Sequence, residues 1–242
     1  MLKMKEIFSK KLYDLSNKIG IVLYEEQLNQ FYEYMKLLIE WNKKINLTAI
    51  IEEDDIILKH FVDSLTVLDY LKGYNSIIDV GTGAGFPGIP IAITCRDKYI
   101  TLMDSLNKRV RFLDDVKKKN KLNNIKTIHS RAEDLGKNKM YREKFDVSIS
   151  RAVANLTTLV EYMLPFVKVG GICICMKGQD INDEIKNSKV AIELLGGEIE
   201  RIDEFYLPDT QMKRNIIVIR KIKKTSDKYP RKAGTPLKEP LS

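Results

Sequence analysis

The sequence has few cysteines and lacks long apolar runs. Its 242 residues include only three cysteines, an odd number spread along the chain, so we expect a reducing compartment and no disulfide framework. Apolar runs stay well short of the ~20 residues that span a bilayer. Residues 1–11 contain one serine and no arginine, and they have no apolar core, so we expect neither a secretory nor a transit signal. These absences predict a soluble, cytoplasmic protein.

Length and charge set broad limits on the kind of protein. A chain of 242 residues with 44% hydrophobic residues can form one large domain, or one domain with an extension. The formal net charge is +8, from 41 basic and 33 acidic residues. Such a balance favours a polyanionic partner such as nucleic acid, although by itself it is a weak signal.

Residues 76–90, Ser-Ile-Ile-Asp-Val-Gly-Thr-Gly-Ala-Gly-Phe-Pro-Gly-Ile-Pro, are the most informative stretch. Ile77, Ile78 and Val80 predict a short strand buried on both faces of a parallel sheet. The glycines that follow remove side chains from one side of a turn, so that the backbone can approach a ligand. Pro87 suits the first position of a helix. Strand, glycine turn and helix start together predict the nucleotide-binding corner of a doubly wound fold.

Two ligands fit this corner. Residues 83–88 match the dinucleotide pattern G-x-G-x-x-G, and Asp104 lies about 20 residues further on, as a nicotinamide enzyme requires. Residues 79–85, however, read Asp-x-Gly-x-Gly-x-Gly and resemble the first motif of S-adenosylmethionine-dependent methyltransferases. A carboxylate at Asp79 suits a ligand with an ammonium group and would repel a pyrophosphate. We therefore favour the methyltransferase, with a nicotinamide oxidoreductase as the alternative.

The rest of the chain predicts an alternation of strands and helices. Residues 1–72 have helical periodicity, with a second helix expected from Asp54 or Asp55 to about Leu71. Further strands are predicted at residues 99–103, 125–128, 145–149 and 171–176. Two late runs, 199–207 and 216–222, have no room for a crossover helix between them and should pair antiparallel.

This pattern predicts an α/β fold that resembles the Rossmann-like class I methyltransferases. We expect a mostly parallel seven-stranded sheet with a terminal antiparallel hairpin. We divide the chain into an N-terminal helical extension (1–72), a methyltransferase domain (73–222) and a basic, Pro-rich tail (223–242). The tail is open to two interpretations: a solvated, partly disordered end, or a strap on RNA phosphates whose removal spares cofactor binding.

Acidic and basic residues at the strand ends are the candidate site. Asp104 can accept both hydroxyl hydrogens of a ribose. Glu133, with a backbone amide nearby, can meet an adenine edge, the alternative being a helix cap. Arg151 ends the fourth strand beside the expected methyl group, or serves as a structural ion-pair partner. His60 is expected to be a packed or surface residue rather than a catalyst, and Ser105 to cap a helix.

Several motifs together are similar to the bacterial 16S ribosomal RNA (guanine-N7) methyltransferase family, formerly glucose-inhibited division protein B. They are Asp79-Val-Gly-Thr-Gly-Ala-Gly-Phe-Pro-Gly, Asp104-Ser-Leu-Asn-Lys-Arg, Arg131-Ala-Glu, Ser150-Arg-Ala-Val-Ala and Tyr229-Pro-Arg-Lys-Ala-Gly-Thr-Pro. The resemblance covers nearly the whole chain and implies methylation of the guanine at position 527 of that RNA, with free RNA, the small subunit and an assembly intermediate left open as the form of the substrate.

The motif and the resemblance together predict the residues that contact S-adenosylmethionine. These are Asp79, Gly81, Gly83, Gly85, Phe86, Asp104, Ser105, Leu106, Ala132, Glu133 and Arg151. Arg151 is also the candidate catalytic residue. We expect no metal site and a monomer.

Methylation at N7 agrees with the motifs that the sequence lacks. Guanine N7 has an in-plane lone pair and no proton, so its methylation needs no general base and no covalent nucleophile. The fourth strand does not end in the Asn/Asp-Pro-Pro-Tyr motif associated with methylation of exocyclic amines. Cys95, Cys173 and Cys175 are predicted to be structural. A non-catalytic RNA-binding module remains the third hypothesis.

Overall fold

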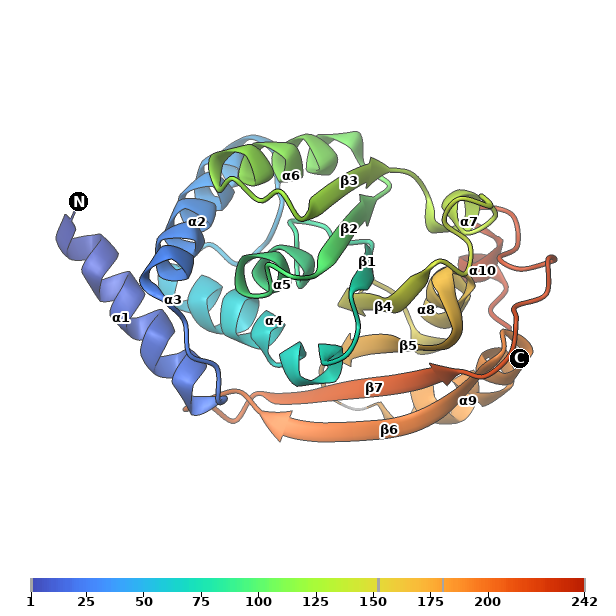
Figure 1. Cartoon of the computed structure of the whole chain (residues 1–242). Coiled ribbons are helices and arrows are strands. Elements are labelled where there is room, and N and C mark those ends of the chain that lie inside the picture. Colours follow the sequence, from blue (N-terminus) through green and yellow to red (C-terminus); the bar gives the residue numbers. More distant parts are fainter. Residues whose placement is uncertain (1, 152, 180, 242) are drawn as a thin grey trace.

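A mixed seven-stranded sheet forms the centre of the molecule (Figure 1). The structure is a computed structural model that describes residues 2–151, 153–179 and 181–241. The strands are β1 (Ser76–Val80), β2 (Tyr99–Asp104), β3 (Ile125–His129), β4 (Phe145–Arg151), β5 (Val167–Lys177), β6 (Gly197–Tyr206) and β7 (Lys213–Lys221). Their order is β3-β2-β1-β4-β5-β7-β6. The five strands β1 to β5 are parallel to one another, and β7 runs antiparallel to both of its neighbours, β5 and β6.

This sheet confirms the predicted fold class, including the terminal hairpin. The predicted strands are all present, although β4 and β5 extend beyond the ranges expected from sequence. The reversed direction of β7 places the start of β7 beside the end of β5, where Lys177 pairs with Asn215. β6 then pairs Phe205 with Arg214. The hairpin therefore brings its turn end to the same edge of the sheet as the carboxyl ends of the parallel strands.

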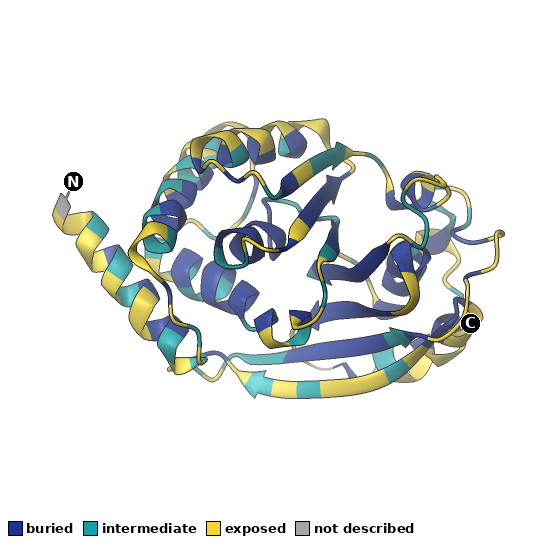
Figure 2. Cartoon of the chain, in the orientation of Figure 1, coloured by how far each residue is buried: buried dark blue, intermediate teal, exposed yellow. Residues whose placement is uncertain are grey.

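Alternate side chains of the central strands enter two separate hydrophobic cores. Ile77 and Ile174 belong to one core, whereas their neighbours Ile78 and Cys175 belong to the other. This is the period of two expected of strands covered on both faces. Figure 2 shows the central strands buried and the edge strand β6 largely exposed. Cys173 and Cys175 are buried in the second core, as predicted, and neither forms a disulfide.

Helices cover both faces of the sheet. α5 (Gly88–Thr94) and α6 (Asn107–Lys119) pack on the first core. α7 (Ala132–Leu135), α8 (Leu156–Met163), the 3₁₀ turn η3 (Leu164–Phe166) and α9 (Asn182–Leu194) contribute to the second. α6 begins at Asn107 after Leu106 as its N-cap residue, so the expected cap at Ser105 is wrong. The backbone amide of Leu106 is instead bound by the Asp104 carboxylate at 2.8 Å.

The N-terminal region is helical, as predicted, and packs on the first core (Figure 1). It contains α1 (Leu2–Lys18), α2 (Glu25–Ile45), α3 (Glu53–Asp55), a π-helix η1 (Ile56–Val62), α4 (Asp63–Leu65) and a 3₁₀ turn η2 (Leu68–Leu71). Tyr34 of α2 and Phe61 of η1 have ring centroids 5.4 and 6.0 Å from that of Phe86 in the glycine turn. The region is thus joined to the turn by aromatic packing, and the domain boundary at residue 72 stays a prediction.

The C-terminal segment, residues 223–241, folds back onto the body instead of extending into solvent. It includes α10 (Thr235–Lys238) and lies close to α7 and α8 (Figure 1). The Arg142 guanidinium donates hydrogen bonds to the carbonyls of Thr225, Ser226 and Tyr229. Tyr229 is 8% exposed. Throughout the described residues, helices fall short of the length and apolar character required to cross a membrane.

Candidate active site

The glycine turn after β1 is held from inside by Asp79. Its Oδ2 accepts hydrogen bonds from the Thr82 hydroxyl at 2.6 Å and from the Gly88 amide at 2.8 Å. The side chain is fully buried, and Oδ1 has no hydrogen-bond partner within the described structure. Burial raises the pKa of Asp79 to about 7, although the bonds from Thr82 and Gly88 oppose the shift. A substantial fraction of this carboxyl is therefore neutral near pH 7.

Two of the predicted contact residues support the turn and lie outside the lining of the cavity beside it. We placed Asp79 against the ammonium group of a cofactor, whereas the structure uses it to tie the turn to the start of α5. Gly85 has a φ of +97°, and a Cβ there would lie 2.8 Å from the Tyr34 hydroxyl oxygen. Glycine is thus required at this position by backbone conformation and packing. A direct cofactor contact of either residue stays a prediction.

Asp104 borders the turn from the end of β2. The side chain is 2% exposed. Its Oδ2 accepts from the Gly83 amide at 2.9 Å and from Arg109 Nη1 at 3.3 Å, while Oδ1 accepts from the Leu106 amide. A carboxylate offers about four lone-pair sites. Three are occupied, so a ribose could form its second bond to Asp104 only if one partner moved, and Arg109 is the one held at the longest distance.

A cavity of about 420 Å³, here called the turn cavity, opens where β1, β2 and β4 end. Six of the predicted contact residues line it: Gly81, Gly83, Phe86, Asp104, Ser105 and Arg151. Gly81 has a φ of +70°, and a Cβ there would lie 2.9 Å from Val153 Cγ2. The glycine thus lets Val153 pack against the backbone. A Cβ on Gly83 (φ +61°), by contrast, would meet nothing within 4 Å, so the bare backbone of this lining residue borders open space.

A second cavity, of about 330 Å³, adjoins the first and is here called the tail cavity. The two share Gly81, Ser105 and Val153. The remaining predicted residues Leu106, Ala132 and Glu133 line the tail cavity, together with Gly234 and Leu237 from the C-terminal segment. The strand ends chosen from sequence thus lie next to one another in the structure, and the C-terminal segment forms a further wall that sequence did not predict.

Glu133 connects the tail cavity to the C-terminal segment. The side chain is 7% exposed, and its Oε1 accepts a hydrogen bond from the Gly234 amide at 2.9 Å. Next to it, Arg231 forms a two-point ion pair with Glu161, with Nη2 to Oε2 at 2.7 Å and Nε to Oε1 at 3.0 Å. The Glu161 carboxylate is fully buried. Two acids of the body therefore fix the segment that closes this cavity.

Arg151 lies at the other end of the turn cavity, and a network of polar groups holds it in place. Its Nη1 contacts the Asp63 carboxylate and the Lys59 carbonyl, each at 3.0 Å. Its Nη2 contacts Nδ1 of His60, also at 3.0 Å. Asp63 in addition accepts from Arg214 at 3.2 Å. Both sequence interpretations of Arg151 are therefore compatible: it is an ion-pair partner, and it borders the cavity.

His60 is a packed residue, as expected, but it also lines the turn cavity. Its ring stacks on Phe86, with centroids 4.3 Å apart and planes 13° apart. Burial, together with the positive charge of Arg151, lowers the pKa of His60 to about 3. The ring is then neutral, so Nδ1 accepts from Arg151 and Nε2 donates to the Thr48 hydroxyl oxygen at 2.9 Å.

Sequence reasoning missed several residues that border the two cavities. Val153 follows the arginine of β4, and Arg109 lies one helical turn after Asp104; both positions carried a signal in their spacing from residues already chosen. Thr48 lies in a connector far from the strand ends. Gly234 and Leu237 come from a segment whose composition indicated only charge and proline. Long-range packing, which a local pattern does not encode, places these last three.

Comparisons with known proteins agree with this geometry. The family described as rRNA small subunit methyltransferase G matches residues 27–217. The ribosomal RNA small subunit methyltransferase G of Clostridium tetani is 50% identical over 237 residues, covering 96% of this chain and 99% of that protein. The protein of the same name from Acetivibrio thermocellus is 51% identical over 234 residues, covering 96% of each chain.

Solved structures share the fold at low sequence identity. M. jannaschii TYW2 in complex with AdoMet is 18% identical, with a TM-score of 0.51, over 62% of this chain and 70% of that one. A SAM-dependent methyltransferase from Aquifex aeolicus is 15% identical, with a TM-score of 0.50, over 65% and 89%. These two show the Rossmann-like class I methyltransferase fold alone. The family match and the relatives near 50% identity go further, and the chain belongs to the rRNA small subunit methyltransferase G family.

Proposed function

We propose that this chain transfers the methyl group of S-adenosylmethionine to N7 of a guanine, the one at position 527, in 16S ribosomal RNA. Family membership supports ribosomal RNA as the substrate class and disfavours the nicotinamide oxidoreductase that the glycine pattern alone left open. The observation that carries the proposal is the pair of adjoining cavities along the ends of β1 to β4, of which the turn cavity reaches Arg151.

The residues present fit the cofactor. Each cavity lies within the size range of small-molecule sites, about 300–1,000 Å³. The tail cavity offers the acid Glu133 for the adenosine end, and Asp104, near the junction, offers an acceptor for a ribose hydroxyl. The turn cavity, with bare backbone at Gly83, would hold the amino-acid end. The bound cofactor supplies an electrophilic methyl group.

The site is suited to positioning rather than to proton transfer. Guanine N7 carries no proton, so the attack requires alignment of the reacting atoms and no general base. The neutral His60 ring has both nitrogens engaged, one by Arg151 and the other by Thr48. In this reaction His60 and Asp63 fix the guanidinium of Arg151, and Arg151 orients the groups at the end of the turn cavity.

We further propose that the enzyme works as a monomer in the cytoplasm, on RNA within the small subunit or an assembly intermediate. The thiols of Cys173 and Cys175 support a reducing compartment, because their sulfurs lie 3.8 Å apart and form a hydrogen bond instead of a disulfide. The net charge of +8 supports a polyanionic substrate.

A substrate with a single altered atom tests the reaction. 16S RNA is transcribed with guanosine or with 7-deazaguanosine, which replaces N7 by a C–H group, and each RNA is used free and reconstituted into small subunits. We expect labelled methyl groups from S-adenosylmethionine to enter the guanosine substrate only, at a single mapped guanine. Equal labelling of both substrates would exclude N7. A chain that binds both cofactor and RNA but transfers no methyl group would be an RNA-binding module.

A further inference from the structure

A third cavity lies on the far side of Arg151 from the cofactor site. It measures about 370 Å³ and is here called the basic cavity. Arg151 and His60 line both this cavity and the turn cavity, so the two spaces meet at this pair of side chains, here called the shared boundary. A group bound in the basic cavity would therefore lie next to the methyl end of a cofactor at the shared boundary.

The sheet hairpin builds the wall of this cavity opposite η1. The register places Lys177 of β5 beside Asn215 of β7, and Phe205 of β6 beside Arg214. All four line the cavity. Met176 and Ile216, which pair with each other in the adjacent register position, add an apolar surface. The antiparallel strands thus bring one half-buried aromatic ring and several polar groups to the edge where the methyl group would be.

The charges around the cavity favour an anionic chain that carries a polar base. Lys59, Arg151, Lys177 and Arg214 contribute four basic side chains, and Asp63 is the carboxylate among the lining residues. Lys59 also pairs with Asp55 at 2.8 Å, and Lys177 with Glu184 at 2.7 Å, both outside the lining. Asp63 is 3% exposed and contacts both arginines, at 3.0 and 3.2 Å. This carboxylate can accept from ring N–H or amino groups, while Lys59 and Arg214, the more exposed of the four basic side chains, suit phosphates.

We propose that the basic cavity receives the target guanine after it has been turned out of its RNA stack. Phe205 lies against the face of the base, and Asp63 accepts from the edge that bears N1–H and the amino group. Enzymes that modify a base commonly take it from the stack into such a pocket, and aromatic side chains are the usual platform for an unstacked RNA base. The assignment rests on the proposed function.

The methyl transfer in this arrangement balances in bonds and charge. The N7 lone pair forms the new N–CH₃ bond as the S–CH₃ bond breaks, and the bonding electrons remain on sulfur. No proton moves, and the base becomes positively charged. The Asp63 carboxylate, next to the shared boundary, lies where it can offset that charge and the neighbouring charge of Arg151.

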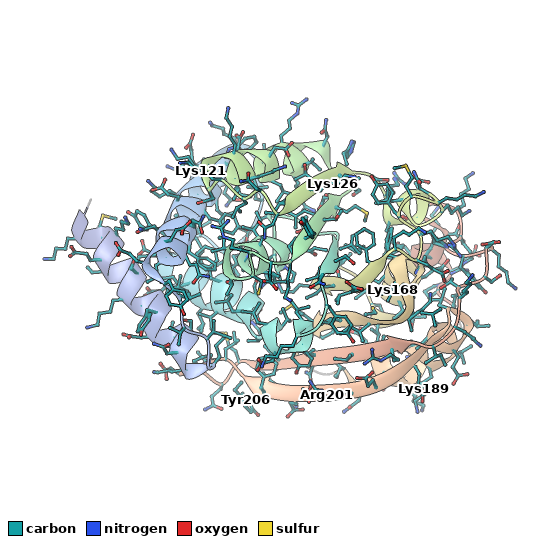
Figure 3. The ribbon with its side chains drawn as sticks, in the orientation of Figure 1. Lys121, Lys126, Lys168, Lys189, Arg201 and Tyr206 are labelled. Atoms are coloured by element: carbon teal, nitrogen blue, oxygen red, sulfur yellow. The ribbon has the colours of Figure 1, made fainter. Side chains whose placement is uncertain are left out.

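Substitution of Phe205 tests the assignment. Phe205→Leu keeps an apolar side chain but removes the aromatic face, and Phe205→Tyr keeps the ring. Tyr206→Ala is the matched control, because this neighbouring aromatic is 54% exposed on the edge strand (Figure 3). Methyl transfer to RNA and cofactor affinity are measured separately. We expect Phe205→Leu to lower kcat/KM for RNA about 10- to 100-fold, in line with the loss of one base-stacking contact. Phe205→Tyr, which keeps the ring, should lose less activity than Phe205→Leu, and Tyr206→Ala should stay within about threefold of the parent chain. All three variants should keep the parent's cofactor affinity.

The outcomes separate this inference from the proposed function. A Phe205→Leu variant that is folded by circular dichroism and methylates RNA as fast as the parent would overturn the base pocket while leaving the proposed function standing. Equal losses in RNA methylation and cofactor affinity would also overturn it, because the ring would then support the cofactor site. A parent chain that methylates no small-subunit RNA would overturn the proposed function and this assignment with it.

Discussion

Asp79 and Asp104 end adjacent strands, yet they lie in different surroundings. The period of two along β1 directs the Asp79 side chain to the face covered by α5, where Gly88 leaves room for it. Asp104 lies at the rim and borders the turn cavity. The sequence predicted both strand ends correctly, because parallel strands finish at one edge. Which acid the helix covers depends on packing that the local pattern does not contain.

Asp79 should make the stability of the fold depend on pH. The folded carboxyl has a pKa of about 7, raised by burial from an ordinary 3.8. Between these values the folded state binds more protons than the unfolded state, so stability falls as pH rises through this window. The loss should reach up to about 4 kcal/mol, since one pKa unit corresponds to about 1.4 kcal/mol. Urea unfolding of the parent and of Asp79→Asn should show this slope in the parent and a weaker one in the variant.

The same variant tests the predicted contact of Asp79 with the cofactor. If the carboxylate only holds the turn, a folded Asp79→Asn chain should keep its affinity for S-adenosylmethionine in calorimetric titration. A clear loss of affinity without loss of fold would instead favour the contact with the ammonium group. Parallel stability profiles for parent and variant would contradict the raised pKa.

Asp104→Ala should weaken S-adenosylmethionine binding by roughly 2–4 kcal/mol, as for hydrogen bonds to a charged group. The variant also frees the amides of Gly83 and Leu106, so part of the loss comes from a less ordered turn. Asp115→Ala, an exposed acid on α6, is the control and should bind normally. Unchanged affinity in Asp104→Ala would remove Asp104 from the cofactor site.

At the scale of elements, the regular segments were predictable and the irregular ones were not. The terminal hairpin followed from the short polar stretch between β6 and β7. The π-helix η1 did not follow from sequence, because apolar spacing does not distinguish it from an α-helix. Yet η1 carries His60 to the shared boundary and Lys59 to the basic cavity. The docking of the C-terminal segment could not be predicted from sequence either, because it depends on contacts with acids far away in the chain.

The C-terminal segment should affect cofactor binding, contrary to our expectation from sequence. Arg231→Ala leaves the Glu161 carboxylate buried without its ion-pair partner, which typically costs about 3–5 kcal/mol. We expect the segment to detach, trypsin to cleave it faster, and S-adenosylmethionine to bind more weakly, because Gly234 and Leu237 line the tail cavity. Lys232→Ala, which removes an exposed neighbour, is the control. Normal cofactor affinity in a chain whose segment is cleaved rapidly would rule out this role.

At the scale of the whole molecule, charge should govern RNA affinity. With a net charge of +8, binding should weaken steeply as salt rises, because bound phosphates release counterions. Exposed lysines of the C-terminal segment can be neutralised without truncating it, in the triple variant Lys224→Gln, Lys228→Gln and Lys232→Gln. If all three meet phosphates, the slope of log affinity against log salt should become shallower by about 2–3.

The control for this charge variant carries the same number of changes elsewhere. Its substitutions are Lys118→Gln and Lys119→Gln, at the C-terminal end of α6, and Lys121→Gln, just beyond it. Figure 3 shows Lys121 on the opposite side of the molecule from α10. This variant should keep the parent's salt slope. Equal slopes for both triple variants would show that the C-terminal charges face away from RNA.

The boundary formed by Arg151 and His60 suggests how the enzyme could be inhibited. Ligands on its two sides would lie close enough to be joined into one molecule, an adenosine moiety in the turn and tail cavities linked to a purine in the basic cavity. Linking makes the second binding event intramolecular, so the joined compound should bind far more tightly than either half. Because such a compound must occupy both cavities in this arrangement, it should discriminate between this enzyme and methyltransferases that share only the cofactor site.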